Sequence, residues 1–354
     1  MSYSVTVQPS GKQFTVEADQ FILEAGIKQG VVLPYGCKNG ACGSCKCKLL
    51  SGEIELGAHQ ASALQPKDVE AGMILTCCAK LKSDIIVEAR VVAAGDIPIK
   101  KMPCRVASLT KAAPDVMIVK LQLPAAEKLQ YLAGQYVELL LRDGSRRAYS
   151  MGCAPHLADQ VELHVRHLPG GKFTDPLFGV TTPAIKEKDI LRFEGPLGTF
   201  FLREDSDKPM VLLASGTGFA PIKALVEQSQ FKSMTRPMTL YWGGRRPQDL
   251  YMHELCAQWA AEMPHFKYVP VISDALTEDH WQGRTGFVHQ AVIQDFSDLS
   301  AYQVYACGAP IVVDSAQRDF IDKCALPADE FFADSFTTAA DTAPKTAPST
   351  SPKV

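Results

Sequence analysis

The sequence predicts a multidomain chain with three different folds: a small strand-helix-strand domain, an antiparallel β-barrel or sandwich, and a doubly wound α/β domain. The chain has 354 residues, too many for one ordinary hydrophobic core. Residues 104–203 contain short alternating apolar runs separated by Gly, Pro and Asp, which is typical of antiparallel strands. Residues 206–336 instead alternate apolar strands with helical stretches, as parallel sheets do. We therefore expect domains at 1–95, 101–203 and 206–336.

Composition and charge narrow the possible partners and location. Apolar residues make up 46% of the chain and charged residues 21%, which is ordinary for a globular protein, and the net charge is −3. Nothing here indicates nucleic acid or an anionic membrane as a partner. The N-terminus lacks a signal-peptide pattern, and no apolar run approaches membrane-spanning length. We expect a cytoplasmic protein, where clustered cysteines suit metal or redox chemistry better than disulfides.

The first domain should open with a hairpin. "SVTVQ" and "KQFTVEA" alternate like strands, and "PSG" between them supplies a turn. "FILEAGIKQG" then predicts a short amphipathic helix that ends at Gly30. After a cysteine-rich loop, "GMILTCCAK" and "DIIVEARVV" each predict a strand. A linker is expected at about residues 93–103, "AAGDIPIKKMP".

The cysteine-rich loop "YGCKNGACGSCKCKLL" has the spacing C-x4-C-x2-C, and two further cysteines follow about thirty positions later. Three thiolates from one loop and a fourth from a distant segment suit a [2Fe–2S] cluster. Structural zinc sites usually pair two short C-x2–4-C or H-x3–5-H units, so this spacing favours the cluster. The intervening small residues let the backbone approach the sulfur atoms. Spacing alone does not separate Cys77 from Cys78 as the fourth ligand.

Residues 1–90 resemble plant-type ferredoxins of the kind fused to reductases, which implies a β-grasp fold. Nine basic and nine acidic residues in 1–95 cancel, which fits a module tethered to its electron donor. Cys47 is then expected to be a packed thiol without a ligand role. The metal ligands that the resemblance implies are Cys37, Cys42, Cys45 and Cys77.

The middle domain contains three polar segments: "RRAYS", "ELHVR" and "GGKFT". Arg147 offers paired donors for a phosphate, Tyr149 a flat ring and Ser150 a hydroxyl. Gly170, Gly171 and Thr174 suggest a backbone approach to an anion. Taken singly, each feature is compatible with an ordinary protein surface.

Together, and with "EGPLGTF" after them, these segments resemble the FAD-binding barrel of the ferredoxin–NADP reductase superfamily. The resemblance implies that Arg147 and the 171–174 segment hold the FAD pyrophosphate. Tyr149 would stack on the isoalloxazine ring, and Ser150 would be a catalytic residue beside flavin N5. The cofactor-binding residues implied in this domain are Arg147, Tyr149, Ser150, His164, Arg166, Gly171, Lys172 and Thr174.

The third domain begins with "MVLLASGTGFAPIKALVE", a strand, a glycine turn and a helix. Such a turn lets a pyrophosphate approach the helix N-terminus. It resembles the G-T-G-x-A-P turn of the same superfamily, which implies nucleotide-binding roles for Gly216, Thr217, Gly218 and Pro221. "YACGAP" resembles the segment that borders the nicotinamide, which implies roles for Cys307 and Gly308. Cys307 would be catalytic through hydride-transfer geometry, or simply a buried thiol.

The nucleotide itself is ambiguous from the sequence. An acidic residue after the second strand favours NADH, and an arginine there can hold the 2′-phosphate of NADPH. "YWGGRRPQDLY" offers Arg245 and Arg246, then Asp249. We expect NADH first, with NADPH possible and Arg245 at the site. "FFADSF" resembles an aromatic segment that covers the flavin, ending at Phe336, and residues 337–354 are expected to be disordered.

The whole chain apart from this tail resembles CDP-6-deoxy-Δ3,4-glucoseen reductases and related oxygenase reductases. The resemblance implies electron transfer from NADH through FAD to the [2Fe–2S] cluster and on to a partner protein. That acceptor would be a pyridoxamine-phosphate-dependent dehydratase or an oxygenase component. Two alternatives stay open: a free flavin or quinone reductase, and an iron–sulfur binding module without catalysis.

Overall fold

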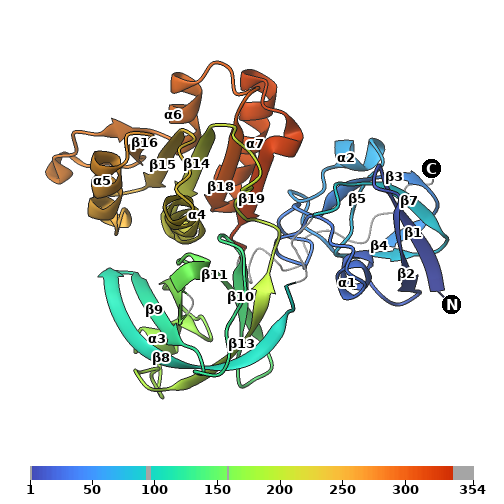
Figure 1. Ribbon diagram of the computed structural model, residues 1–354, viewed down its shortest axis with the longest axis horizontal. Coiled ribbons are helices and arrows are strands. Elements are labelled where there is room, and N and C mark those ends of the chain that lie inside the picture. Colours follow the sequence, from blue (N-terminus) through green and yellow to red (C-terminus); the bar gives the residue numbers. More distant parts are fainter. Residues whose placement is uncertain (1, 93–96, 158, 338–354) are drawn as a thin grey trace. The chain divides into compact units, whose positions relative to one another are not determined.

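The computed structural model describes residues 2–92, 97–157 and 159–337, and Figure 1 traces them by colour along the chain. The chain divides into two compact units, residues 1–96 with the segment from 334 onward, and residues 97–333. The predicted disorder of the tail falls, apart from Thr337, outside the described residues. In the described ranges, none of the helices has the length and apolar character needed to cross a bilayer.

The first unit is a mixed five-stranded sheet with a short helix and a long loop. Its strands run in the order β2-β1-β7-β3-β5, with β1 antiparallel to β2 and parallel to β7. Alternate strand residues and the apolar face of α1 form one core, as the period-2 and helical patterns require. The elements are β1 (Ser2–Gln8), β2 (Lys12–Glu17), α1 (Ile22–Lys28), β3 (Lys46–Ser51), β4 (Ile54–Leu56), α2 (Pro66–Glu70), β5 (Met73–Leu75), β6 (Ala79–Leu81) and β7 (Ile85–Glu88).

Two predictions for this region were wrong in detail. "GMILTCCAK" forms two strands, β5 and β6, because the chain turns between them and the Cys78 N–H donates to the Leu75 carbonyl at 3.2 Å. The expected linker at 93–103 includes the start of β8, which begins at Lys100. Lys100 to Arg105 pair with β13, so hydrogen bonding to a distant strand overrides the local linker signal.

The second unit begins with a six-stranded antiparallel sheet in the order β11-β10-β13-β8-β9-β12. Its two edge strands meet through a bridge between Met151 and Leu163, which closes the sheet. Of the two architectures that the sequence allowed, the structure is therefore the barrel. The elements are β8 (Lys100–Ala113), β9 (Val116–Gln122), β10 (Tyr136–Leu140), β11 (Arg146–Ser150), η1 (Pro155–Leu157), β12 (Gln160–Arg166), α3 (Thr174–Leu177) and β13 (Ile190–Leu197).

The rest of this unit is the predicted doubly wound domain, with strand order β17-β16-β15-β14-β18-β19 and parallel pairing from β17 to β18. Its elements, visible in Figure 1, follow in chain order. They are β14 (Met210–Ser215), η2 (Gly216–Gly218), α4 (Phe219–Phe231), β15 (Met238–Gly244), η3 (Pro247–Asp249), α5 (His253–Glu262), β16 (Phe266–Ile272), η4 (Thr277–Asp279), β17 (Arg284–Thr285), α6 (Val288–Asp295), β18 (Gln303–Gly308), α7 (Pro310–Cys324), η5 (Ala328–Glu330) and β19 (Phe331–Ser335).

The strand order fixes where this domain can bind a ligand. From β14 the chain builds outward through β15 and β16, and later returns to add β18 on the other side of β14. The strand order therefore reverses between β14 and β18. Ligands of open parallel sheets bind at the carboxyl ends of the strands at such a point. Here those ends carry Gly216 and Gly308.

Candidate functional site

The first unit holds the four predicted thiols in two pairs. The Cys37 and Cys42 side chains are hydrogen-bonded to each other, and so are those of Cys45 and Cys77. Cys45 and Cys77 are buried, whereas Cys37 and Cys42 are partly exposed. One pair from the loop and one pair that joins loop to β-turn match the two irons of a [2Fe–2S] cluster, each of which takes two thiolates.

Backbone N–H groups point at these sulfur atoms. The Gly40 N–H donates to Cys77 Sγ at 3.2 Å, and the Cys42 N–H donates to Cys37 Sγ at 3.3 Å. Gly40 has φ +76°, a left-handed backbone that favours glycine, and a Cβ there would lie 3.0 Å from the Ala58 carbonyl oxygen. N–H donors to sulfur stabilise negative charge on a cluster and tune its potential.

The thiol pKa values show why the site needs a cation. The hydrogen bond from Cys42 lowers the pKa of Cys37, while the same bond and burial raise that of Cys42. The hydrogen bond with Cys77 and burial raise the pKa of Cys45, and the pKa of Cys77 is raised as well although its bond with Cys45 acts to lower it. Three of the four thiols would therefore have to give up a proton to bind a metal ion as thiolates. In the described part of the chain, no three His, Cys, Asp or Glu residues converge on a single metal ion.

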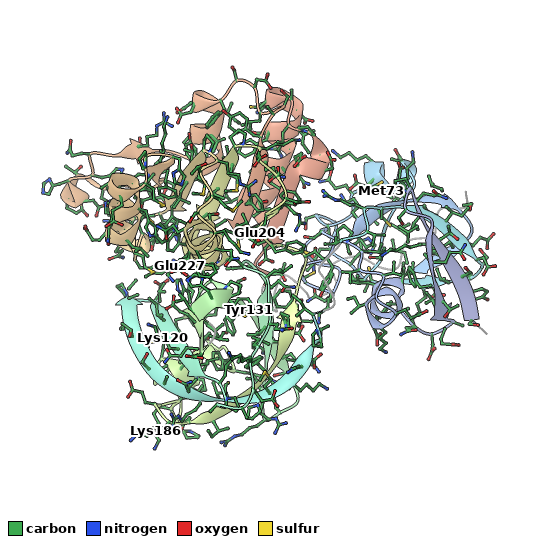
Figure 2. All side chains as sticks on the ribbon, in the orientation of Figure 1. Met73, Lys120, Tyr131, Lys186, Glu204 and Glu227 are labelled. Atoms are coloured by element: carbon green, nitrogen blue, oxygen red, sulfur yellow. The ribbon has the colours of Figure 1, made fainter. Side chains whose placement is uncertain are left out.

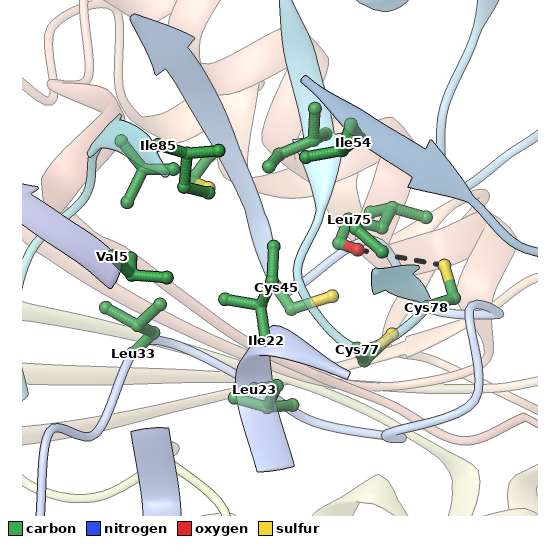
Figure 3. Close-up of a cluster of buried hydrophobic side chains, with 14 of the residues drawn as sticks. Val5, Ile22, Leu23, Leu33, Cys45, Ile54, Leu75, Cys77, Cys78 and Ile85 are labelled. Carbon is green, nitrogen blue, oxygen red and sulfur yellow. Dashed lines mark hydrogen bonds between the residues drawn. The ribbon is translucent and has the colours of Figure 1, made fainter. Parts of the chain in front are cut away.

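Cys77 and Cys78 differ in their partners. The Cys78 thiol faces the Leu75 carbonyl oxygen at 3.8 Å (Figure 3), and its side chain also lies within hydrogen-bonding reach of the Cys77 thiol. Cys77 instead receives the Gly40 N–H and pairs with Cys45. Cys47 is buried in the core, and burial raises its pKa, so it remains a packed thiol.

In the second unit, the barrel strand β11 presents the three predicted flavin residues. Arg147 and Tyr149 share one face of the strand by alternation. Neighbouring Arg146 pairs with Glu138 at 2.8 Å and with Glu194 at 2.9 Å. Within the described ranges no carboxylate pairs with Arg147, whose Nη1 donates to the Arg146 carbonyl at 2.7 Å. Arg147 thus keeps donors for an anion.

The "GGKFT" loop lies against the same strand. The rings of Tyr149 and Phe173 are 5.5 Å apart, which ties loop to strand. Thr174 Oγ1 donates to the Leu168 carbonyl at 2.8 Å, and the Gly171 N–H donates to the same carbonyl at 2.9 Å. These bonds close a tight loop that brings backbone beside Tyr149.

Lys172, in the same loop, is exposed and pairs with Asp143 at 2.6 Å. Ser150 is buried at the end of β11. The Lys172 amine is therefore already paired, whereas the Ser150 side chain is buried at the end of the strand that carries Arg147 and Tyr149.

The glycine turn after β14 packs directly on the end of β18. A Cβ on Gly218 would collide with the Cys307 carbonyl oxygen, and one on Gly308 would lie 2.6 Å from the Ser215 carbonyl oxygen. Trp242 Nε1 donates to the Gly216 carbonyl at 3.0 Å and holds the turn from β15. The predicted nucleotide segments thus converge. Thr217 and Pro221 are buried in this turn and the first turn of α4.

Arg166 joins the barrel to this turn. It ends β12, and its guanidinium atoms lie 3.3–3.4 Å from where a Gly216 Cβ would be. Its Nε is 3.2 Å from Asp115 and its Nη2 is 3.8 Å from Asp249. Neither nitrogen makes a well-directed hydrogen bond with any described residue. A half-buried guanidinium with two unfilled donors beside a phosphate-binding turn fits a dinucleotide phosphate.

Comparison with known proteins agrees with these three sites. The 2Fe-2S iron-sulfur cluster binding domain matches residues 5–82, the oxidoreductase FAD-binding domain residues 103–202, and the oxidoreductase NAD-binding domain residues 212–318. The chain is 42% identical to CDP-6-deoxy-L-threo-D-glycero-4-hexulose-3-dehydrase reductase of Yersinia pseudotuberculosis, over 95% of this chain and 99% of that protein.

The chain belongs to the family of iron–sulfur flavoprotein reductases.

Two further relatives extend the comparison. The reductase is 34% identical to reductase component 1 of terephthalate 1,2-dioxygenase from Comamonas, over 96% of this chain and 98% of that one. A crystal structure of an Amycolatopsis cytochrome P450 reductase superposes with a TM-score of 0.74 at 33% identity, covering 95% and 99% of the two chains. The predicted fold class, oxidoreductase activity and the cofactors [2Fe–2S], FAD and NAD(P)H are confirmed.

The side chain of one predicted cofactor residue, His164, lies inside the protein. The His164 side chain is fully buried, and its ring nitrogens face Tyr251 Oη at 2.8 Å and Glu162 Oε1 at 3.0 Å. Both ring nitrogens of His164 are therefore occupied by protein partners. Burial lowers its pKa more than Glu162 raises it, so the ring is neutral near pH 7.

His164 belongs instead to a buried charged network where the barrel meets α4. Lys223 Nζ lies 3.0 Å from Glu162 and 2.6 Å from Glu227, and donates to the Gly152 carbonyl at 2.8 Å. Glu227, labelled in Figure 2 above Tyr131, also accepts the Ala154 N–H at 3.1 Å. Sequence reasoning missed this network, although Lys223 and Glu227 at i, i+4 in the otherwise apolar start of α4 were a signal for it.

Proposed function

We propose that this reductase oxidises NADH at the β14–β18 edge and delivers single electrons to a separate acceptor enzyme through FAD and the four-thiol cluster. Bound FAD supplies the conversion of a hydride's electron pair into single electrons. The observation that carries the proposal is Arg166, a barrel residue whose guanidinium lies 3.3 Å from the Cβ position of Gly216. The barrel and the nucleotide turn belong to one compact unit, and strand β12 of the barrel reaches the turn through this side chain.

The chain's own residues would bind and orient the two cofactors. Arg147, with donors unclaimed by any carboxylate in the described ranges, would hold the FAD pyrophosphate together with the 171–174 loop. Tyr149 would cover one flavin face, supported by Phe173 at 5.5 Å. Ser150 would lie beside flavin N5.

On the nucleotide side, Cys307 and Gly308 would border the nicotinamide, because they end β18 at the point where the strand order reverses. Arg166 would hold a dinucleotide phosphate. None of these roles requires a strong acid or base.

For the acceptor, we propose a dehydrase acting on a CDP-6-deoxyhexulose. The support is the 42% identity to a reductase named for such a dehydrase, against 34% for the terephthalate dioxygenase reductase. The alternative acceptor is an oxygenase component. A cytoplasmic location is also proposed, since reducing conditions keep cluster thiols available.

Reconstitution tests both parts. An anaerobic NADH titration followed by low-temperature EPR should bleach the flavin and produce the signal of a reduced [2Fe–2S] cluster. A bleached flavin with a silent cluster would favour a free flavin or quinone reductase. Mixed with each acceptor, the reduced protein should be reoxidised by the dehydrase. Rapid reoxidation by the oxygenase component and none by the dehydrase would refute the proposed acceptor.

A further inference from the structure

Two arginines follow β15, at the edge where the adenosine ribose of a bound nucleotide lies in doubly wound folds. On residue type alone they permit NADPH, because an arginine at this edge can hold the 2′-phosphate. The structure shows that both guanidinium groups are already engaged by carboxylates from a neighbouring loop. Arg245 pairs with Asp274, and Arg246 pairs with Asp279.

Arg246 is held in the way a phosphate would hold it. Its Nε donates to Asp279 Oδ2 at 2.8 Å and its Nη2 donates to Asp279 Oδ1 at 2.7 Å. Such a two-point pair uses the same donors that recognise a phosphate. A second carboxylate is close by, since Glu278 Oε1 lies 4.0 Å from the same Nη2. Only one third of the Arg246 side chain is exposed, so the pair restricts where the guanidinium can turn.

Arg245 is more open. Its Nε lies 3.1 Å from Asp274 Oδ2, and its side chain is 82% exposed. A single exposed ion pair contributes little energy and leaves the side chain mobile. Asp274 therefore does not lock Arg245, but it offsets the positive charge that would otherwise attract a 2′-phosphate.

The carboxylates lie at this edge because backbone hydrogen bonds continue between the two segments that follow β15 and β16. After β15 and β16 end, the Ser273 N–H donates to the Gly244 carbonyl at 2.9 Å, and the Asp274 N–H donates to the Arg245 carbonyl at 3.0 Å. The loop after β16 thus runs beside the two arginines. Asp249 adds a further carboxylate, whose Oδ2 accepts the N–H groups of Arg245 at 2.8 Å and Arg246 at 3.0 Å.

Around this strand end, four carboxylates surround two arginines. A 2′-phosphate carries about −1.5 to −2 charges near neutral pH, and like charges at close range are unfavourable, whereas a 2′-hydroxyl carries none. We propose that Asp274, Glu278 and Asp279 are specificity-determining residues that occupy Arg245 and Arg246 and so exclude NADPH. This inference rests on the proposed oxidation of a nicotinamide nucleotide by the same site.

The test is the ratio of apparent Kd values for NADPH and NADH, measured by anaerobic stopped-flow reduction of the flavin in the holoprotein. In the unaltered protein, NADPH should bind at least about tenfold more weakly than NADH. The triple variant Asp274→Asn, Glu278→Gln, Asp279→Asn keeps side-chain size and frees both arginines. Its ratio should fall by about tenfold or more.

Two further variants make the result specific. Asp298→Asn removes one exposed carboxylate of the same domain near the start of β18, at the opposite edge of the sheet, and should leave the ratio unchanged. Adding Arg246→Ala to the triple variant should reverse its gain in NADPH binding. Equal use of both nucleotides by the unaltered protein, or an unchanged ratio in a triple variant that retains its flavin spectrum, would overturn the inference. Failure of either nucleotide to reduce the flavin would instead defeat the proposed function.

Discussion

Gly218 packs so closely on Cys307 that a Cβ at Gly218 would collide with the Cys307 carbonyl oxygen. The same Cβ would lie 2.7 Å from the Gly308 Cα. Gly218 has an ordinary helical φ of −58°, so the requirement for glycine comes from this close approach and not from backbone strain. The contact sets the distance between the phosphate-binding turn and the segment proposed to border the nicotinamide.

Gly218→Ala should therefore slow NADH-dependent flavin reduction by about 100-fold, because a displacement of about 1 Å in a positioning segment has an effect of that size. FAD content and the cluster spectrum should be retained, since both sites lie on other segments. Anaerobic stopped-flow absorbance at the flavin band would measure the rate. Gly286→Ala is the control, because Gly286 has φ +106° with nothing within 4 Å of a Cβ, so it brings strain without a collision. Equal slowing in both variants would contradict the expectation.

The two adjacent cysteines of "LTCCA" should behave differently. Cys77→Ala removes a thiol that pairs with Cys45 and accepts the Gly40 N–H, so the [2Fe–2S] cluster should be lost. Cys78→Ala removes a thiol directed at the Leu75 carbonyl and should leave the cluster in place. Visible absorption, iron content and the EPR signal of the reduced protein would distinguish them. If the Cys78 variant lost the cluster and the Cys77 variant kept it, Cys78 and not Cys77 would be the fourth ligand.

The sequence carried enough information for the three folds and for most cofactor segments, because each depends on local patterns. The thiol spacing, the strand alternation and the Gly216–Gly218 turn are properties of short stretches. The pairing of Arg246 with Asp279 is different, since it arises only when β15 and β16 lie side by side. Residue types at one strand end left a 2′-phosphate site open, and a loop from the next strand pairs both arginines there with carboxylates.

The partners of the His164 side chain could not be predicted from the sequence for a similar reason. A histidine in a cofactor-binding segment has the same sequence appearance whether it faces a ligand or a neighbouring helix. Glu162 is the partner of His164, and only the packing of α4 against the barrel brings Lys223 to Glu162. Lys223 in turn pairs with Glu227. The sequence likewise could not distinguish Cys77 from Cys78, because the turn between β5 and β6 decides which thiol faces the loop.

The two adjacent arginines on β11 should differ in how much each contributes to FAD binding. Arg147→Ala should weaken FAD binding by about tenfold to 100-fold, because it removes charged donors proposed for the pyrophosphate. Arg146→Ala removes a surface arginine that pairs with Glu138 and Glu194, and FAD affinity should change by less than about threefold. Fluorescence titration of flavin-depleted protein would give both dissociation constants. Equal weakening in the two variants would argue against a specific role for Arg147.

The buried network around Glu162 should make the stability of the second unit depend on acid. Burial acts to raise the pKa of Glu162, but His164 and Lys223 outweigh it and lower the pKa to about 2 from 4.5. The ionised form therefore stabilises the fold above pH 4.5, and this contribution is lost as the pH falls from about 4.5 toward 2. Its size is up to roughly 3 kcal/mol.

Glu162→Gln should lower the urea midpoint of this unit at pH 7, and the difference from the unaltered protein should narrow between pH 4.5 and 3. Tryptophan fluorescence reports on this unit, because Trp242, Trp259 and Trp281 all lie in it. Glu127→Gln is the control, since Glu127 forms an exposed pair with Lys100 and should change the midpoint little at any pH. A difference that stays constant down to pH 3 would mean that shape, and not ionisation, is what Glu162 contributes.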